Sequence, residues 1–101
     1  QIAVMANGNQ TVTIDLHPGY YEPIIVQKGI PVKFNIRAAA NALNGCNDAV
    51  QIPEFEIQKP LIPGDNWIEF TPDQTGVIPY SCWMGMIRSE ILVVEALPQV
   101  R

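Results

Sequence analysis

Hydrophobic and polar residues alternate along several short stretches of this chain. The clearest alternation covers 32–37, where Val32, Phe34 and Ile36 are apolar and the residues between them are polar. Residues 11–16 repeat the same period of two, which is typical of strands with one buried face. Residues 90–95 contain four consecutive apolar positions. A strand that is apolar on both faces is predicted to lie at the centre of a sheet.

Shorter strands are predicted between these stretches, with glycine and proline turn signals separating them. They cover 24–27 and 66–70, and residues 2–5 predict an edge strand. Segments 50–53 and 55–58 predict two short strands or one bent strand. Segment 38–49 reads as a long loop with room for one helical turn. No long helix is predicted, and the pattern indicates an all-β fold, a Greek-key antiparallel β-sandwich of seven to eight strands. Loops gather at the two ends of such a sandwich, which allows segment 38–49 and the loop containing Cys82 to share one end.

Composition fits one small domain. The 101 residues are 48% hydrophobic and 16% charged, which is enough apolar material for a packed core. We assign residues 1–95 to the domain and 96–101 to a tail or linker. The net charge of −4 argues against nucleic acid as a partner. No apolar run approaches the length of a membrane span, so a membrane would be reached through a segment absent from this chain. The opening on Gln1 suggests a processed chain or a piece of a longer protein.

A thiol and two thioethers fall within five residues, at Cys82, Met84 and Met86. In an extended segment these three side chains point the same way, while Trp83 points the other way. Thiolates and thioethers are soft donors, and soft donors select Cu(I). The only other cysteine is Cys46. The working hypothesis is a Cu(I) site made by Cys46, Cys82, Met84 and Met86.

Two simpler interpretations compete with this hypothesis. The two cysteines can form a structural disulfide, and the methionines can fill gaps in a core. The single His17 excludes a blue-copper site, which needs two histidines and a cysteine. It also leaves no evident nucleophile and base pair, so we do not expect an enzyme. As a loop residue, Cys82 is expected to contribute little to the core, and Cys82→Ser is expected to leave the fold intact.

Several turn and loop motifs resemble the cupredoxin family. They are GYYEP (19–23), KGIPV (28–32), GC (45–46), GDN (64–66), EFTP (69–72), Gly76 and YSCWMGM (80–86). The resemblance covers about residues 11–95, nearly the whole domain. It departs from the electron carriers of that family, because Cys46 stands where they place a histidine and no histidine follows Cys82 in its loop.

The sequence is similar instead to the Cu(I)-binding cupredoxin domains of bacterial copper resistance. These include a membrane-anchored copper chaperone, the N-terminal domain of some copper-exporting P-type ATPases, and domains fused to heavy-metal transport membrane proteins. The resemblance implies that Cys46 and Cys82 are the thiolate pair, bridging if two ions bind. Met84 and Met86 would be weaker thioether ligands, and the cargo would be one or two Cu(I) ions.

The function implied is that of a copper chaperone or of the metal-loading domain of a transporter. Its partner would be a copper-transporting membrane protein or the metal-binding domain of one. A working dithiol site needs a reducing environment, which favours a membrane-associated soluble domain at the cytoplasmic face; an extracytoplasmic position stays open. Two alternatives are kept: an electron carrier with an atypical Cys/Met copper site, and a disulfide-stapled interaction module without metal.

Overall fold

Short strands make up most of the computed structural model, which describes residues 1–98. The strands are β1 (Val4–Ala6), β2 (Asn9–Asp15), β3 (Ile24–Gln27), β4 (Val32–Ala38), β5 (Ala49–Ile52), β6 (Ile57–Pro60), β7 (Gly64–Phe70), β8 (Gly76–Cys82) and β9 (Arg88–Val94). Two short 3-10 helices, η1 (Ala40–Ala42) and η2 (Pro53–Phe55), interrupt them. The helical turn allowed for in segment 38–49 is therefore present as η1.

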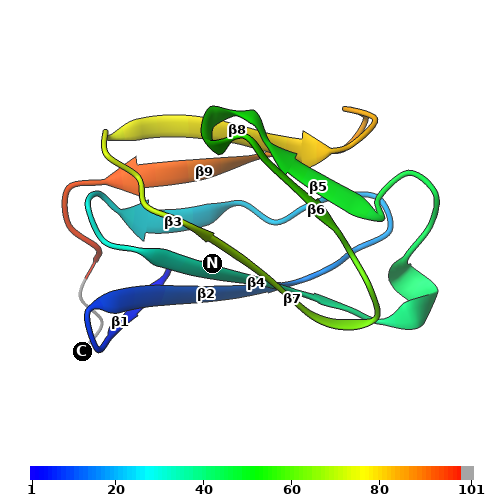
Figure 1. Ribbon diagram of the computed structural model, residues 1–101, viewed down its shortest axis with the longest axis horizontal. Helices are drawn as coiled ribbons and strands as arrows, with labels where there is room; N and C mark the ends of the chain where they lie inside the picture. The colour runs from blue at the N-terminus through cyan, green and yellow to red at the C-terminus, as the bar shows by residue number, and fades with distance from the viewer. Residues whose placement is uncertain (99–101) are drawn as a thin grey trace.

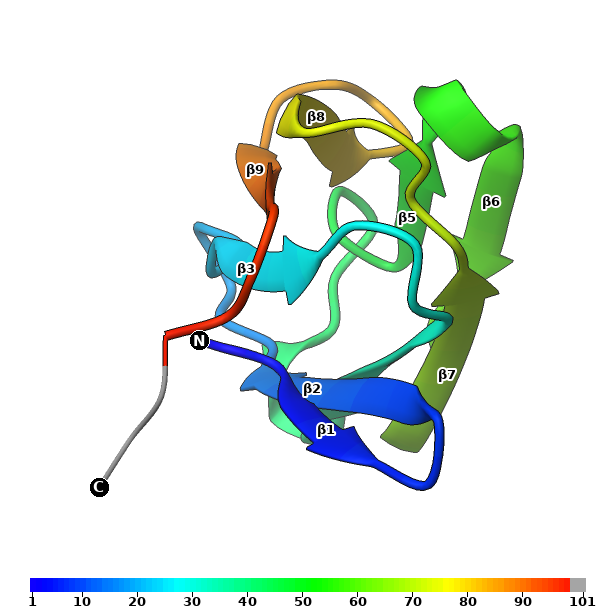
Figure 2. The same cartoon turned by 90° about the vertical axis from the view of Figure 1, so that its left-hand side faces the viewer.

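The strands form two sheets that pack face to face, as the view from one end shows (Figure 2). One sheet has the order β1-β2-β4-β7 and the other has the order β3-β9-β8-β5-β6. The central position predicted for the apolar run at 90–95 is confirmed, because β9 lies between β3 and β8. The prediction of an all-β sandwich is confirmed.

Strand number and direction differ from the prediction. Nine strands are present in residues 1–98, and the sandwich is not wholly antiparallel, because β2 pairs with β4 and β3 pairs with β9 in parallel. The chain leaves β2, forms β3 in the other sheet, and returns as β4 in the direction of β2 (Figure 1). A period of two identifies the buried face of a strand but carries no information on the direction of its neighbour.

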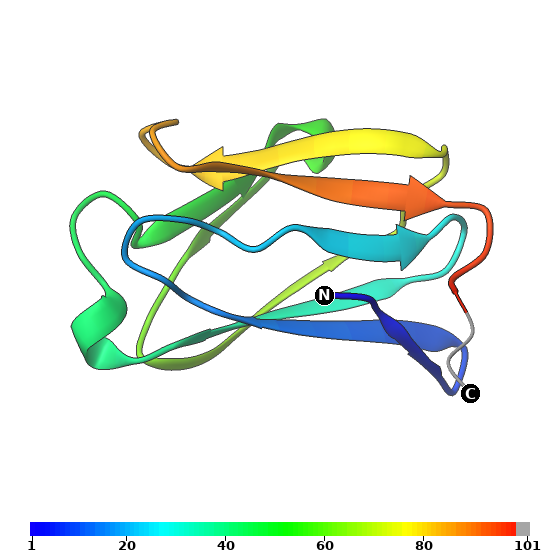
Figure 3. The same cartoon turned by 180° about the vertical axis from the view of Figure 1, so that it is seen from behind.

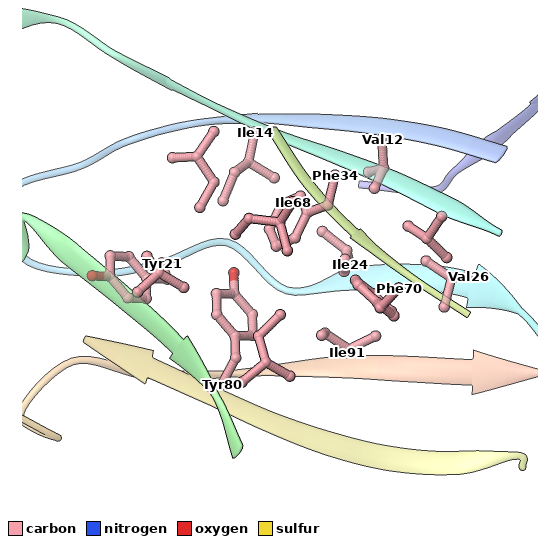
Figure 4. Close-up of a cluster of buried hydrophobic side chains, with 14 of the residues drawn as sticks. Val12, Ile14, Tyr21, Ile24, Val26, Phe34, Ile68, Phe70, Tyr80 and Ile91 are labelled. Carbon is pink, nitrogen blue, oxygen red and sulfur yellow. The ribbon is translucent and has the colours of Figure 1, made fainter. Parts of the chain in front are cut away.

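The core lies between the sheets and is built around Tyr80 of β8 (Figure 4). The Tyr80 ring meets Phe34 of β4 edge to face at a centroid distance of 5.7 Å. It also stacks on Tyr21 at 5.6 Å. The Tyr80 hydroxyl donates to the backbone carbonyl of Glu22, and the Tyr21 hydroxyl donates to the carbonyl of Asn47 at 3.1 Å. The aromatic core therefore reaches directly into the loop that contains Cys46.

The chain after β9 returns to the sandwich. The backbone N–H of Leu97 donates to Oε1 of Gln27 at 3.1 Å, and the Leu97 side chain packs partly against the core. Residues 99–101 of the predicted tail lie outside the described residues, so the boundary at residue 95 stays a prediction. Within residues 1–98, no helix combines the length and the apolar character needed to cross a bilayer.

Candidate metal centre

Cys82 is the last residue of β8 and belongs to the core. It pairs with Val50 of β5 in the antiparallel register, and its side chain is fully buried. The expectation that Cys82 is a loop residue with little share in the core is therefore wrong. Its position at the end of a strand, where pairing with β5 ceases, holds the thiol between the sandwich interior and the following loop.

The chain turns immediately after Cys82 instead of continuing as an extended segment. The N–H of Gly85 donates to the carbonyl oxygen of Cys82 at 2.9 Å, which closes a turn. Gly85 has a φ of 72°, a left-handed conformation that a glycine adopts without strain. The prediction that Cys82, Met84 and Met86 share one face of a strand is therefore wrong. An alternation of side chains requires extended backbone, and the turn removes it.

The turn folds backbone N–H groups around the Cys82 sulfur. The N–H of Ile87 donates to Sγ at 3.3 Å, and the N–H of Cys82 donates back to the Ile87 carbonyl at 2.9 Å. Burial raises the pKa of the Cys82 thiol, but hydrogen bonds from the backbone N–H groups of residues 84–87 stabilise the thiolate. The net effect is a pKa below the ordinary value for cysteine. A lowered pKa favours the form of the sulfur that binds soft metals.

Both loop methionines are accessible from solvent. Met84 is 49% exposed and Met86 is 75% exposed. These values exclude the simpler interpretation that the two thioethers fill the core. The structure therefore places one buried thiol at the end of β8 and two exposed thioethers in the turn that follows it.

The second thiol, Cys46, is exposed in the loop between η1 and β5. Its backbone is held by two asparagines. Asn44 Oδ1 accepts the N–H of Cys46 at 2.8 Å and the N–H of Asn47 at 3.0 Å. Asn47 is fully buried, its Oδ1 accepts the N–H of Asn44 at 2.8 Å, and its Nδ2 donates to the carbonyl of Ala42 at 2.8 Å. The shape of the Cys46 loop is thus held by hydrogen bonds within the chain.

The two cysteine loops lie side by side at one end of the sandwich, as the topology predicted (Figures 1 and 3). Trp83 joins them. Its backbone N–H donates to the carbonyl of Ala49 at 2.9 Å, and its indole Nε1 donates to the carbonyl of Gly45 at 3.1 Å. Cys46 therefore lies in a segment that is bonded on both sides to the residue following Cys82.

Sequence reasoning missed the residues that shape the centre. Trp83 was expected to point away from the ligands, and its contact with Gly45 spans 38 positions. Asn44 and Asn47 carried a weak signal, since asparagine in a turn often bonds a backbone N–H two positions further on. The spacing of the two asparagines does not reveal that they bond to each other's backbone.

Other candidate ligands are engaged elsewhere or scattered. His17 Nε2 lies 3.3 Å from Oε2 of Glu22, and its ring stacks on Tyr20. No cluster of three or more histidine, cysteine, aspartate or glutamate side chains occurs among residues 1–98. Both cysteines are free thiols. The four sulfur residues predicted as ligands, Cys46, Cys82, Met84 and Met86, lie in or directly beside the two loops at this end of the sandwich.

Comparisons with known proteins agree with the fold, and two of the similar structures are of copper-binding or metal-binding proteins. No protein-family model matches the sequence. No curated protein matches it either. Among solved structures, a reduced variant of amicyanin is similar with a TM-score of 0.58 and 18% identity over 89% of this chain and 86% of that chain. At this identity the likeness concerns the fold alone, and it assigns the sandwich to the cupredoxin architecture.

Two further structures are more similar. A copper-binding protein, solved in the apo form, has a TM-score of 0.83 and 26% identity over 93% of this chain and 96% of that chain. The metal-binding domain of a Cu(I)-exporting P-type ATPase from Streptococcus pneumoniae, solved with Cu(I), has a TM-score of 0.81 and 29% identity over 93% of this chain and 94% of that chain. The chain is thus similar over nearly its whole length to two copper-binding domains.

Proposed function

We propose that this domain binds Cu(I) as cargo through Cys46 and Cys82 and passes it on with the help of Met84 and Met86. The main observation behind the proposal is that Trp83, which follows Cys82, forms hydrogen bonds to the loop that contains Cys46 at one end of the sandwich. Two thiolates are strong anionic donors for a soft cation, and two neutral thioethers beside them are weaker ones. No catalytic step is assigned to the domain.

The structural neighbours support the same cargo. One is named a copper-binding protein and the other is a metal-binding domain solved with Cu(I). A role as a chaperone or as the metal-loading domain of a transporter follows by similarity. The partner we propose is a copper-transporting membrane protein or the metal-binding domain of one. We further propose that the domain works at the cytoplasmic side of a membrane, where thiols stay reduced.

The exposures of the four sulfur residues suggest a route for the ion. Met84, Met86 and Cys46 are exposed, and Cys82 is buried. Neutral thioethers hold Cu(I) weakly and independently of pH, whereas thiolates hold it tightly and compete with protons for it. An incoming ion is captured by the outer sulfurs and held by the thiolate pair. A second ion, if one binds, would share the thiolates and rely on the methionines.

An anaerobic titration of the reduced protein with Cu(I), in competition with a chromogenic Cu(I) chelator, tests the proposal. We expect tight uptake of one ion, followed by a second ion held more weakly. Failure of the reduced protein to compete for any Cu(I) would contradict the proposed function. Thiols must be counted in the same sample, so that oxidation is not mistaken for lack of affinity.

The same samples separate the alternatives. An electron carrier with a Cu(II)–thiolate bond absorbs visible light, whereas Cu(I) has a filled d shell and is colourless. A disulfide-stapled module would show no reactive thiols after unfolding under non-reducing conditions. We expect a colourless copper complex and two reactive thiols.

A further inference from the structure

We propose that Trp83 is a positioning residue, whose indole N–H holds the Cys46 loop in place beside Cys82. The inference rests on the proposed function only for its effect on copper. Its effect on the metal-free protein stands on hydrogen bonds and exposures alone. The contact is made by the edge of the Trp83 ring, through its N–H.

The Cys46 loop is attached to the rest of the domain on both sides of the cysteine. On one side, the Tyr21 hydroxyl from the core holds the carbonyl of Asn47 at 3.1 Å. On the other side, Trp83 Nε1 holds the carbonyl of Gly45 at 3.1 Å. Gly45 is exposed and is followed directly by Cys46. Without the indole contact, this side of the loop would keep only the local bonds made by Asn44.

The position of Trp83 suits this task better than it suits packing. Its side chain is 47% exposed, so it gains only part of the free energy that a buried tryptophan gains. Indole Nε1 is a donor without acceptor capacity, and in Trp83 it donates to a backbone carbonyl, that of Gly45. The other tryptophan, Trp67 of β7, is 46% exposed and makes no side-chain hydrogen bond within residues 1–98. Trp83 and Trp67 are thus almost equally exposed, but only Trp83 donates a hydrogen bond through its indole N–H within residues 1–98.

The contact has a consequence for metal capture. Cys46 is exposed, so packing alone does not fix its backbone. A thiolate on a mobile loop must be ordered when a metal binds, and that ordering lowers the affinity. Because the indole N–H already orders part of the loop before the ion arrives, less ordering remains to take place on binding. Removal of this N–H lowers the affinity without removing a sulfur ligand.

Trp83→Phe is the direct test, because phenylalanine keeps an aromatic ring and lacks the N–H donor. Trp67→Phe is the matched control, with the same chemical change at the same exposure. In the reduced, metal-free proteins, NMR hydrogen exchange is followed at the amides of Cys46 and Asn47, which both bond to Asn44 Oδ1. Loss of one hydrogen bond predicts exchange about three- to tenfold faster at these amides in Trp83→Phe, with β2 and β4 unchanged. Trp67→Phe should match the wild type.

Competition with a Cu(I) chelator then gives the metal readout. We expect Trp83→Phe to bind the first Cu(I) about three- to tenfold more weakly, and Trp67→Phe to bind it as the wild type does. Unchanged loop exchange in Trp83→Phe would overturn the inference, as would faster exchange spread evenly over the whole domain. If wild-type protein binds no Cu(I), the proposed function fails, while the exchange rates still decide whether Trp83 positions the loop.

Discussion

Cys82 lies directly opposite Val50 across the β5–β8 pair, and both side chains are fully buried. One of the two proposed thiolate ligands is thus a core residue, whereas the other, Cys46, is exposed. The proposed site joins the interior of the sandwich to its surface. This asymmetry governs how substitutions at the two cysteines should behave.

Cys82→Ser should weaken both the fold and the site. A buried hydroxyl in place of the thiol is expected to lower the free energy of unfolding by about 1–3 kcal/mol, and tight Cu(I) binding should be lost. Urea unfolding of the metal-free protein measures the first effect, and chelator competition measures the second. Cys46→Ser is the matched control: it should also lose tight binding, but with a change in stability of no more than about 0.5 kcal/mol. Equal destabilisation by the two substitutions would contradict the asymmetry.

The double substitution Met84→Leu and Met86→Leu should separate the two kinds of sulfur. Leucine preserves apolar bulk and removes the thioether. The first Cu(I) should bind as tightly as before, because the thiolate pair remains. The second ion should bind at least about tenfold more weakly, or transfer to an acceptor should slow by a similar factor. Met5→Leu, at an exposed methionine in β1, is the control for a general effect of losing a thioether. A tenfold loss at the first ion would show that the methionines belong to the tight site.

The pH dependence of stability should reveal the Cys82 thiolate. Its folded pKa is lowered, so the thiolate form stabilises the fold above the unfolded pKa of about 8.5. This contribution is lost as the pH falls through the lowered folded pKa. The free energy of unfolding of the metal-free wild type should therefore rise between neutral pH and about pH 9, relative to Cys82→Ala. If the free energy of unfolding changed with pH by the same amount in the wild type and in Cys82→Ala, a lowered pKa would be contradicted.

Alkaline unfolding should involve the two core tyrosines. Burial raises the pKa values of Tyr21 and Tyr80, because a phenolate is poorly solvated between the sheets. Above about pH 10, the unfolded chain loses these protons more readily than the folded chain does, so stability falls as the pH rises. Phenolate absorbance and loss of near-ultraviolet circular dichroism should appear together.

Tyr80→Phe tests the role of one of these tyrosines. It removes the hydroxyl that donates to the Glu22 carbonyl, and we expect a loss of about 1 kcal/mol at neutral pH. It should also remove part of the alkaline absorbance change. An unchanged amplitude would show that Tyr80 does not titrate during unfolding.

The pattern of apolar residues was sufficient to predict the architecture. Strict alternation at 32–37 and the apolar run at 91–94 correspond to β4 and β9, each of which lies between two partner strands. The direction of pairing was not predictable in this way. The strands β2 and β4 pair in parallel, as do β3 and β9. Those pairings depend on where the chain crosses between sheets, which local periodicity does not encode.

The candidate site was predictable in its residue types but not in its geometry. The soft donors at Cys82, Met84 and Met86 could be identified from the amino-acid sequence alone. Their common face was predicted from an extended backbone, and the turn closed by Gly85 removed it. The bond from Trp83 to Gly45 joins residues far apart in the chain, and no local pattern signals such a contact.

The paired hydrogen bonds between Asn44 and Asn47 have a thermodynamic consequence for metal uptake. A loop that already has its shape loses little conformational entropy when an ion arrives, and it buries little new apolar surface. Calorimetric uptake should therefore show a heat-capacity change near zero, unlike domains that fold around their metal. Because the loop is held by hydrogen bonds within the chain, the domain is expected to remain folded after it has delivered its ion.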